Sequence, residues 1–267
     1  MKNLLTIAGS DSSGGAGIQA DLKTFAAHGT FGMSVITAVT AQNTCGVTKV
    51  QNIDCDVVEA QIKAVFDDIK VDAVKIGMVS QPEIIETISR CLRYYQPAVI
   101  VVDPVMISKS GYPLLVPEAC NTLIKELLPL ATLLTPNLPE AEAITGMKIT
   151  RKEEMLPAAE KIIALGTKAV LLKGGHLNAA SDDLLFDGNE EIWLPGKRIA
   201  TKNTHGTGCT LSSSLAANLA KGMELRQAAA ASKAYVTKAI EYGIPLGSGC
   251  GPTHHFVDLY RKAGILD

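Results

Sequence analysis

Short apolar runs alternate with amphipathic segments along almost the whole chain, and this alternation limits the fold more than any other feature. Apolar runs of this length are typical of buried strands, and they occupy residues 4–8, 33–41, 73–76, 98–102, 132–135 and 169–172. Segments with helical spacing of apolar residues lie between them, at residues 18–28, 54–70, 82–95, 117–128 and 151–165. The alternation predicts an α/β fold, in which helices cover both faces of a mostly parallel central sheet.

The chain provides enough apolar residues for one large core. It has 267 residues, of which 47% are hydrophobic, and neither a linker nor a repeat interrupts it. We therefore expect a single domain over residues 1–267. Residues 182–187 and 190–194 are expected to form a hairpin around Gly188 and Asn189.

Charge and composition exclude several classes of function. The net charge is −2 with both signs scattered, and aromatic residues make up only 4%, so we expect no nucleic-acid partner. The apolar run before Gly9 is too short for a signal peptide, and no run reaches membrane-spanning length, so we expect no membrane partner. The cysteines are scattered without a C-x-x-C pair, which favours the reducing cytoplasm.

Residues 204–210, Thr-His-Gly-Thr-Gly-Cys-Thr, precede a helical stripe of Leu211, Leu215 and Leu219. A helix start has unpaired amides and about half a positive charge, and glycine leaves room for an approaching anion. Cys209 lies in the first turn, where this field is expected to lower the pKa of a thiol. The stretch predicts an anion hole with a nucleophile or base beside it.

Polar side chains follow the ends of the predicted strands. In parallel sheets such residues meet at one edge, where ligands bind; here they are Gly9, Gln42, Met78, Asp103, Asn137 with Glu140, and Lys173. Asp103 and Glu140 are expected to hold Mg²⁺, and Lys173 is expected to neutralise a phosphate. Simpler roles are a turn before Pro104, an acid at a helix start and an exposed lysine. Gln42 can read a polar ring edge, because an amide both donates and accepts.

Other motifs do not support a function. Residues 15–20 fit G-x-G-x-x-A, but no Asp or Glu occurs in residues 22–53 to hold a ribose, so we reject a dinucleotide site. There is no P-loop and no protein-kinase signature. The histidines lack zinc-ligand spacing, and we expect them to serve in capping or core hydrogen bonds.

Several motifs together resemble the hydroxymethylpyrimidine/phosphomethylpyrimidine kinases of thiamine biosynthesis, within the ribokinase-like superfamily. They cover essentially the whole chain in order, at residues 8–17, 41–44, 75–78, 136–140, 172–176, 203–210 and 249–255. The resemblance implies a three-layer ribokinase-like sandwich with a small flap at residues 107–114. It also implies a homodimer that uses ATP and Mg²⁺.

The resemblance also implies a role for each matching residue. Gln42 would hydrogen-bond the aminopyrimidine, in a pocket lined by Gly9, Asp21, Met78 and Val105. Gly206, Thr207 and Gly208 would form the anion hole, and Asp103, Asn137 and Glu140 would organise Mg²⁺. Lys173, Asn137 and Thr207 would contact the nucleotide. Cys209 stands where many sugar kinases carry the aspartate that takes the hydroxyl proton.

The implied activity is phosphorylation of 4-amino-5-hydroxymethyl-2-methylpyrimidine and then of its monophosphate. Two alternatives remain at this point. A pyridoxal or pyridoxine kinase of the same superfamily is one, although residues 108–113 contain no cysteine of the kind some of those enzymes carry in the flap. A protein that binds the pyrimidine without transferring phosphate is the other.

Overall fold

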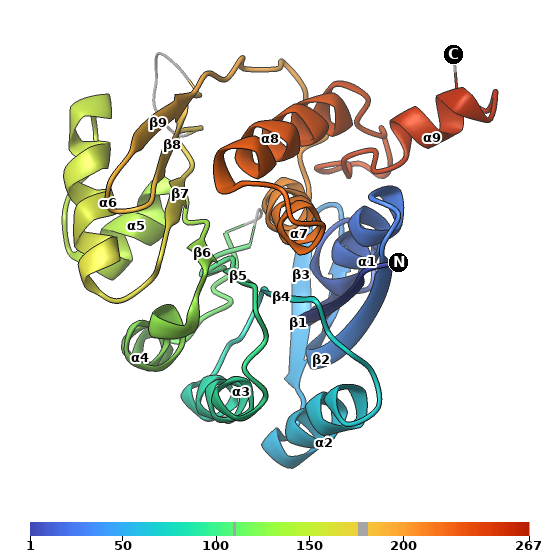
Figure 1. The fold of residues 1–267 in the computed structure, drawn as a ribbon. Helices are drawn as coiled ribbons and strands as arrows, with labels where there is room; N and C mark the ends of the chain where they lie inside the picture. Colours follow the sequence, from blue (N-terminus) through green and yellow to red (C-terminus); the bar gives the residue numbers. More distant parts are fainter. Residues whose placement is uncertain (109–110, 176–180, 267) are drawn as a thin grey trace.

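The computed structural model describes residues 1–108, 111–175 and 181–266, and its strands form one nine-stranded sheet (Figure 1). The strand order is β3-β2-β1-β4-β5-β6-β7-β8-β9. The central strands from β2 to β7 run parallel, whereas β3 at one edge and β8 and β9 at the other are antiparallel. The prediction of a mostly parallel α/β sheet is therefore confirmed.

The strands lie close to where the apolar runs predict them. Their bounds are β1 Asn3–Asp11, β2 Phe31–Asn43, β3 Gly46–Asn52, β4 Ala73–Ile76, β5 Ile100–Val102, β6 Leu133–Leu134, β7 Val170–Leu172, β8 Asp183–Phe186 and β9 Glu191–Leu194. The hairpin at β8 and β9 is confirmed. The first strand does not end at Gly9 but continues to Asp11, because β1 keeps pairing with β2 beyond a register shift between Ala8 and Ser10.

Helices cover both faces of the sheet, as expected. One face carries α1 Gly17–Ala27, α7 Thr207–Ala220 and α8 Leu225–Glu241, and the opposite face carries α2 Cys55–Phe66, α3 Pro82–Tyr95, α4 Pro117–Thr122, α5 Leu138–Thr145 and α6 Met155–Ala164. The short α9, Val257–Lys262, lies near the C-terminus (Figure 1). No helix among the described residues combines the length and the apolar character needed to cross a bilayer.

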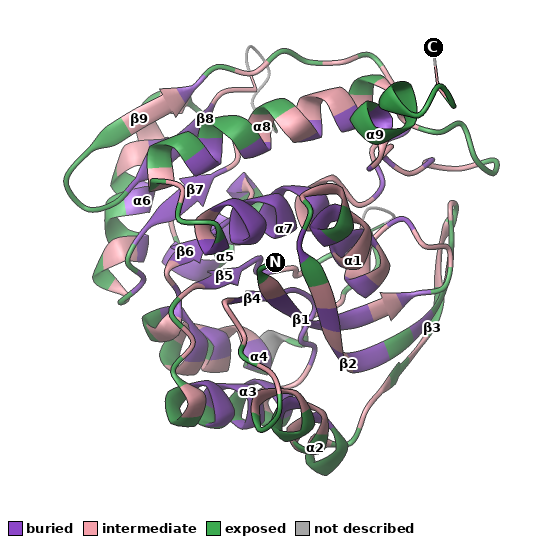
Figure 2. Cartoon of the chain, turned by 45° about the vertical axis from the view of Figure 1, so that its right-hand side comes forward, coloured by how far each residue is buried: buried purple, intermediate pink, exposed green. Residues whose placement is uncertain are grey.

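Alternate residues of each strand supply the two cores, because successive side chains point to opposite faces. Leu4, Ala73 and Val101 pack under α1 and α7, whereas their neighbours Leu5, Val74 and Val102 pack under the helices of the opposite face. All these side chains are buried, whereas exposed residues lie on the outer sides of the helices, in loops and on the edge of the sheet at β2 and β3 (Figure 2). The sheet is thus the middle of three layers.

Two predicted helices are less regular than their spacing suggests. The segment after α4 widens into a π-helical turn, Leu123–Leu127, and then tightens into a 3₁₀ turn, Leu128–Leu130. Pro129 has no amide hydrogen to continue the helical ladder. The helix predicted from residue 151 begins with the 3₁₀ turn Lys152–Glu154 before α6.

Candidate active site

The first turn of α7 is open at the place where the sequence predicts an anion hole. Gly206 is the N-cap residue with φ 80°, and no side chain caps the helix. A Cβ atom on Gly206 would lie 1.8 Å from the carbonyl oxygen of Gly15, so only glycine fits between the two loops. The Thr207 amide makes only a long bond to the Thr204 carbonyl, at 3.4 Å, and the amides of Gly208 and Cys209 have neither an intrahelical partner nor a side-chain cap.

A buried charge cluster lies directly beside this helix start. Lys173 Nζ is 3.0 Å from Asp103 Oδ1 and 3.9 Å from Glu140 Oε2. A Cβ atom on Gly208 would lie 3.3 Å from Asp103 Oδ2 and 3.6 Å from Lys173 Nζ, so this glycine brings the helix start against the cluster. Residues that follow β5, β6 and β7 therefore meet at one edge of the sheet, as predicted.

The lysine of this cluster stays charged because both carboxylates face it. Burial opposes the charged form of Lys173, but the neighbouring Asp103 and Glu140 outweigh burial and raise its pKa. The Lys173 side chain is 18% exposed, so part of it can still be reached by a ligand. A charged ammonium group next to uncapped amides is suited to binding a phosphate.

Glu140 has a structural role in capping a helix. It closes a capping box at the start of α5: its Oε2 accepts from the Asn137 amide at 2.7 Å, and Asn137 Oδ1 accepts from the Glu140 amide at 2.9 Å. The Asn137 side-chain oxygen is therefore engaged in the cap. Burial raises the pKa of Glu140 to about 7, against the opposing effect of Lys173.

The donor chemistry of the cluster fits Mg²⁺, which prefers oxygen ligands and keeps several waters. Asp103 and Glu140 supply carboxylate oxygens on either side of Lys173. Over the ranges that the structure describes, no group of three or more His, Cys, Asp or Glu is arranged to hold a metal. An ion here would therefore need water or phosphate oxygens to complete its shell.

Cys209 differs from the expectation for a helix start. Burial raises the pKa of the thiol to about 11, although Lys75 and a hydrogen bond from the Gly17 amide act in the opposite direction. The predicted lowering of the pKa is therefore wrong, because the loss of hydration outweighs the helix field. The thiol stays protonated at neutral pH.

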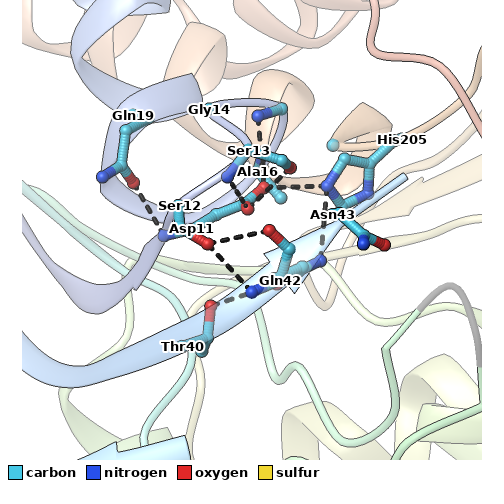
Figure 3. Close-up of polar contacts among 12 residues, drawn as sticks. Asp11, Ser12, Ser13, Gly14, Ala16, Gln19, Thr40, Gln42, Asn43 and His205 are labelled. Carbon is cyan, nitrogen blue, oxygen red and sulfur yellow. Dashed lines mark hydrogen bonds and ion pairs between the residues drawn. The ribbon is translucent and has the colours of Figure 1, made fainter. Parts of the chain in front are cut away.

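The residues expected around the pyrimidine contact one another or lie close together only in part. The Gln42 side chain lies between Thr40 and His205 at the end of β2 (Figure 3). A Cβ atom on Gly9 would lie 2.9 Å from Met78 Cε, so these two residues are in contact, and Val105 is half-buried just after Asp103.

Asp21 does not line a pocket in this structure. Its side chain has no exposed surface and forms an ion pair with Lys75 at 2.9 Å. It also accepts from Thr6 Oγ1 at 2.6 Å and from Ser213 Oγ at 2.7 Å. The expected contact of Asp21 with the substrate is corrected accordingly: the carboxylate joins β1, β4, α1 and α7 inside the protein.

Sequence reasoning missed Lys75, although a signal was present. A single lysine inside the apolar run of residues 73–76 cannot be buried without an anionic partner. Asp21 is that partner, and it helps raise the pKa of Lys75 against the effect of burial.

The expected flap is a short bend between residues 107 and 114. Ile107 and Pro113 pair as an isolated antiparallel bridge, and the Ser108 amide donates to the Tyr112 carbonyl at 2.8 Å. Ile107 is 59% exposed. Lys109 and Ser110 of this segment, and His176 of another quoted motif, lie outside the described residues.

His205 and Asp11 form a contact that was not expected. His205 Nε2 lies 2.8 Å from Asp11 Oδ2 and joins the last residue of β1 to the residue before the anion hole (Figure 3). Hydrogen bonds from His205, Ser13 and Ala16 outweigh burial and lower the pKa of Asp11 to about 2. Both residues are nearly inaccessible to solvent, so the pair holds two loops of the site together.

Comparison with known proteins identifies the family of the chain. A model of the phosphomethylpyrimidine kinase family matches residues 11–254. The hydroxymethylpyrimidine/phosphomethylpyrimidine kinase of Rhizobium meliloti (strain 1021) is 55% identical over 256 residues, covering 94% of this chain and 96% of that protein.

Solved structures show the same similarity. A phosphomethylpyrimidine kinase from Clostridium difficile 630 is 55% identical with a TM-score of 0.81, covering 90% of this chain and all of that chain. A Bacillus subtilis pyridoxal kinase in an ADP complex is 42% identical with a TM-score of 0.89, covering 96% and 98%. The chain belongs to the phosphomethylpyrimidine kinase family and has its ribokinase-like fold.

Proposed function

We propose that this chain transfers the terminal phosphoryl group of ATP to the hydroxymethyl group of 4-amino-5-hydroxymethyl-2-methylpyrimidine, and then to the resulting monophosphate. The observation that carries the proposal is the uncapped first turn of α7 beside Lys173 and Asp103. Membership of the family and an ADP complex of a similar kinase support ATP as the donor.

Gly206, Thr207 and Gly208 would hold the transferring phosphoryl group through their amides. Phosphoryl transfer passes through a loose transition state, so positioning and charge stabilisation supply most of the rate. Lys173 would neutralise charge on the nucleotide phosphates, and Thr207 and Asn137 would lie along the nucleotide. Asp103 and Glu140 would hold Mg²⁺, which would supply positive charge to neutralise the phosphates.

Cys209 would accept the hydroxyl proton of the substrate. With a thiol pKa near 11, only a small fraction of Cys209 is thiolate at neutral pH. Only that fraction, which has already released its own proton to solvent, can take the proton of the substrate hydroxyl. Little base strength is needed in a loose transition state, and the proton would leave the hydroxyl late. Gln42 would read the pyrimidine, with Gly9, Met78 and Val105 as pocket walls.

One assay tests the function. Purified protein is incubated with ATP, Mg²⁺ and the hydroxymethylpyrimidine, and ADP and the phosphorylated products are followed. We expect monophosphate first and diphosphate later. ADP release that does not depend on the pyrimidine, or none at all, contradicts the proposal and leaves a pyrimidine-binding protein as the remaining interpretation.

Pyridoxal phosphorylation is the second candidate, favoured by the close similarity to the Bacillus subtilis pyridoxal kinase. The same assay with pyridoxal in place of the pyrimidine decides between the two. We expect a higher kcat/KM for the aminopyrimidine than for pyridoxal. A higher kcat/KM for pyridoxal would make pyridoxal kinase the better-supported function.

We also propose that the protein acts as a single kinase domain and a homodimer in the cytoplasm. Its cysteines are free, which supports a reducing compartment. The proposal of a homodimer is supported only by the similarity of the chain to the family. Light scattering of the purified protein tests it, and a mass of one chain contradicts it.

A further inference from the structure

The Asp11 carboxylate is surrounded by hydrogen-bond donors. Oδ1 accepts from the Ser13 amide at 2.8 Å and from Ser13 Oγ at 2.7 Å. Oδ2 accepts from the amides of Gly15 at 3.1 Å and Ala16 at 2.8 Å. A group whose oxygens both accept bonds of this kind is held in its ionised form.

The ionised Asp11 carboxylate determines which nitrogen of the His205 imidazole carries a hydrogen. Its Nε2 lies 2.8 Å from Asp11 Oδ2, and an ionised carboxylate can only accept. Nε2 must therefore carry a hydrogen and donate it to Asp11. A Cβ atom on Gly15 would lie 2.3 Å from His205 Cδ2, so the loop also packs directly against the ring.

The protonated Nε2 in turn determines the orientation of the neighbouring Gln42 side-chain amide. The Gln42 side-chain nitrogen is placed 3.3 Å from His205 Nε2, where two N–H donors would face each other. A protonated Nε2 repels a second donor, whereas an oxygen at this position can share the hydrogen that Nε2 donates to Asp11. The consistent orientation is therefore the reverse of the placed one: the Gln42 carbonyl oxygen points to His205, and its amide nitrogen, in place of the oxygen found there, points to Thr40. The two ends of such an amide are distinguished by their partners rather than by their shape.

Thr40 requires the same orientation. Its hydroxyl donates its single hydrogen to the Ser10 carbonyl at 2.8 Å, so at Gln42, 3.3 Å away, it can only accept. Only the amide nitrogen of Gln42 can donate that bond. The backbone of Gln42 is held as well, because Ser12 Oγ bonds both its amide and its carbonyl, at 2.9 and 2.8 Å (Figure 3).

We propose that Asp11 and His205 are positioning residues that fix which end of the Gln42 amide is donor and which is acceptor, and thereby the direction in which the substrate ring binds. The proposal rests on the proposed function, in which Gln42 reads the aminopyrimidine. It adds Asp11 and His205, on the side of Gln42 that faces the anion hole, to the residues that act in substrate binding.

The fixed amide selects a ring edge of defined chemistry. One hydrogen on its nitrogen and one lone pair on its oxygen remain for a ligand. They match an edge that carries an exocyclic amino group next to a ring nitrogen, and they match it in one direction only. If the ring binds in the reversed direction, its amino group faces the amide nitrogen of Gln42, and its ring nitrogen faces the amide oxygen, so neither pair can form a hydrogen bond. A pyridine ring without that amino group cannot make both bonds.

A double-mutant cycle tests the coupling. His205→Leu removes the donor, and His205→Gln keeps an N–H group on a side chain of similar reach. With the aminopyrimidine, we expect His205→Leu to lower kcat/KM about tenfold and His205→Gln to restore most of it. In the Gln42→Ala background, His205→Leu should cost less than about twofold. The KM for ATP should stay within about twofold throughout.

Additive losses in the cycle, or a KM for ATP that rises as much as the KM for the pyrimidine, overturn the proposal and leave His205 as a support of the anion hole. Thermal unfolding of each variant identifies misfolded protein, and calorimetric affinity for the pyrimidine repeats the cycle without catalysis.

A measurement independent of catalysis separates this proposal from the proposed function. Long-range ¹H–¹⁵N correlation spectra of the wild-type protein report the tautomer of His205. We expect hydrogen on Nε2 at neutral pH, and an unprotonated Nε2 overturns the orientation. If the wild-type protein neither binds nor phosphorylates the aminopyrimidine, the proposed function is wrong. The role of Asp11 and His205 in substrate binding is then wrong with it, whatever the tautomer of His205.

Discussion

Lys75 Nζ lies 2.9 Å from each carboxylate oxygen of Asp21, and neither side chain is exposed to solvent. The pair joins the central strand β4 to helix α1 underneath the anion hole. Both charges are removed from water, so each depends on the other for its stability.

Removing one member of this pair should destabilise the fold strongly. We expect Lys75→Met to lower the free energy of unfolding by about 3–5 kcal/mol, because Asp21 is then a buried charge without its counter-ion. Lys75→Met combined with Asp21→Asn should recover part of this loss. Denaturant unfolding measures both effects.

The exposed pair of Lys238 and Asp258, at 2.8 Å, provides the control: Lys238→Met should cost no more than about 1 kcal/mol. Equal losses at the two sites would contradict the assigned role of Lys75.

Replacing the thiol of Cys209 should affect the chemical step. We expect Cys209→Ala to lower kcat by about 10²-fold with little change in the KM for ATP, because the proton acceptor is lost while the amides remain. Cys55→Ala is a matched control, since Cys55 also stands in the first turn of a helix, α2, away from the site. Near wild-type turnover of Cys209→Ala would remove the sulfur from the chemistry.

The raised pKa of Cys209 also predicts low thiol reactivity. The thiolate is the reactive form, and at pH 8 a thiol with pKa about 11 is about 0.1% ionised. Exposed Cys45 should therefore be alkylated by iodoacetamide well before Cys209. Peptide mass spectrometry over a time course measures the order, and preferential labelling of Cys209 would show that the helix field prevails over burial.

A methyl group at the start of α7 should block the anion hole. In Gly208→Ala the new Cβ would lie 3.3 Å from Asp103 Oδ2, in the space between the helix start and the Lys173 cluster. We expect kcat to fall by about 10²–10³-fold with a melting temperature close to that of the wild type. A variant that keeps its turnover would place the transferred phosphoryl group elsewhere.

His255 should make stability depend on pH. Burial lowers its pKa to about 4 from 6.5, so the unfolded chain takes up a proton at a higher pH than the folded protein does. The stability contribution is complete above about pH 6.5 and is lost as the pH falls towards 4, by about 3 kcal/mol. His255→Gln should have a smaller loss between pH 6.5 and 4 in denaturant unfolding, and an unchanged pH profile would contradict the assignment.

Much of the fold could be predicted from the sequence, because buried strands and amphipathic helices leave periodic signals. Residues 73–76 and 82–95 were predicted with the bounds that the structure has for β4 and α3. The meeting of Asp103 and Lys173 followed from parallel strands ending at one edge. The place of Gly206 in an anion hole could be predicted from the sequence, because a helix start that leaves room for an anion needs glycine.

The remaining features depend on contacts between distant residues. The pKa of Cys209 could not be read from its place in the first turn, because burial by surrounding elements decides it. Asp21 and Lys75 are 54 positions apart, and no local pattern connects them. The bond between Asp11 and His205 spans 194 positions, and only the folded sheet brings its two loops together.

The contact between Gly15 and Gly206 has a consequence during translation. The nascent chain can begin its central strands early, but the loop that carries Gly15 lacks its contact with Gly206 until that later segment has left the ribosome. A truncated polypeptide that stops before α7 would have a sheet and no phosphoryl-binding turn. Catalytic competence is therefore acquired only near the end of synthesis, when the last quarter of the polypeptide closes over the first.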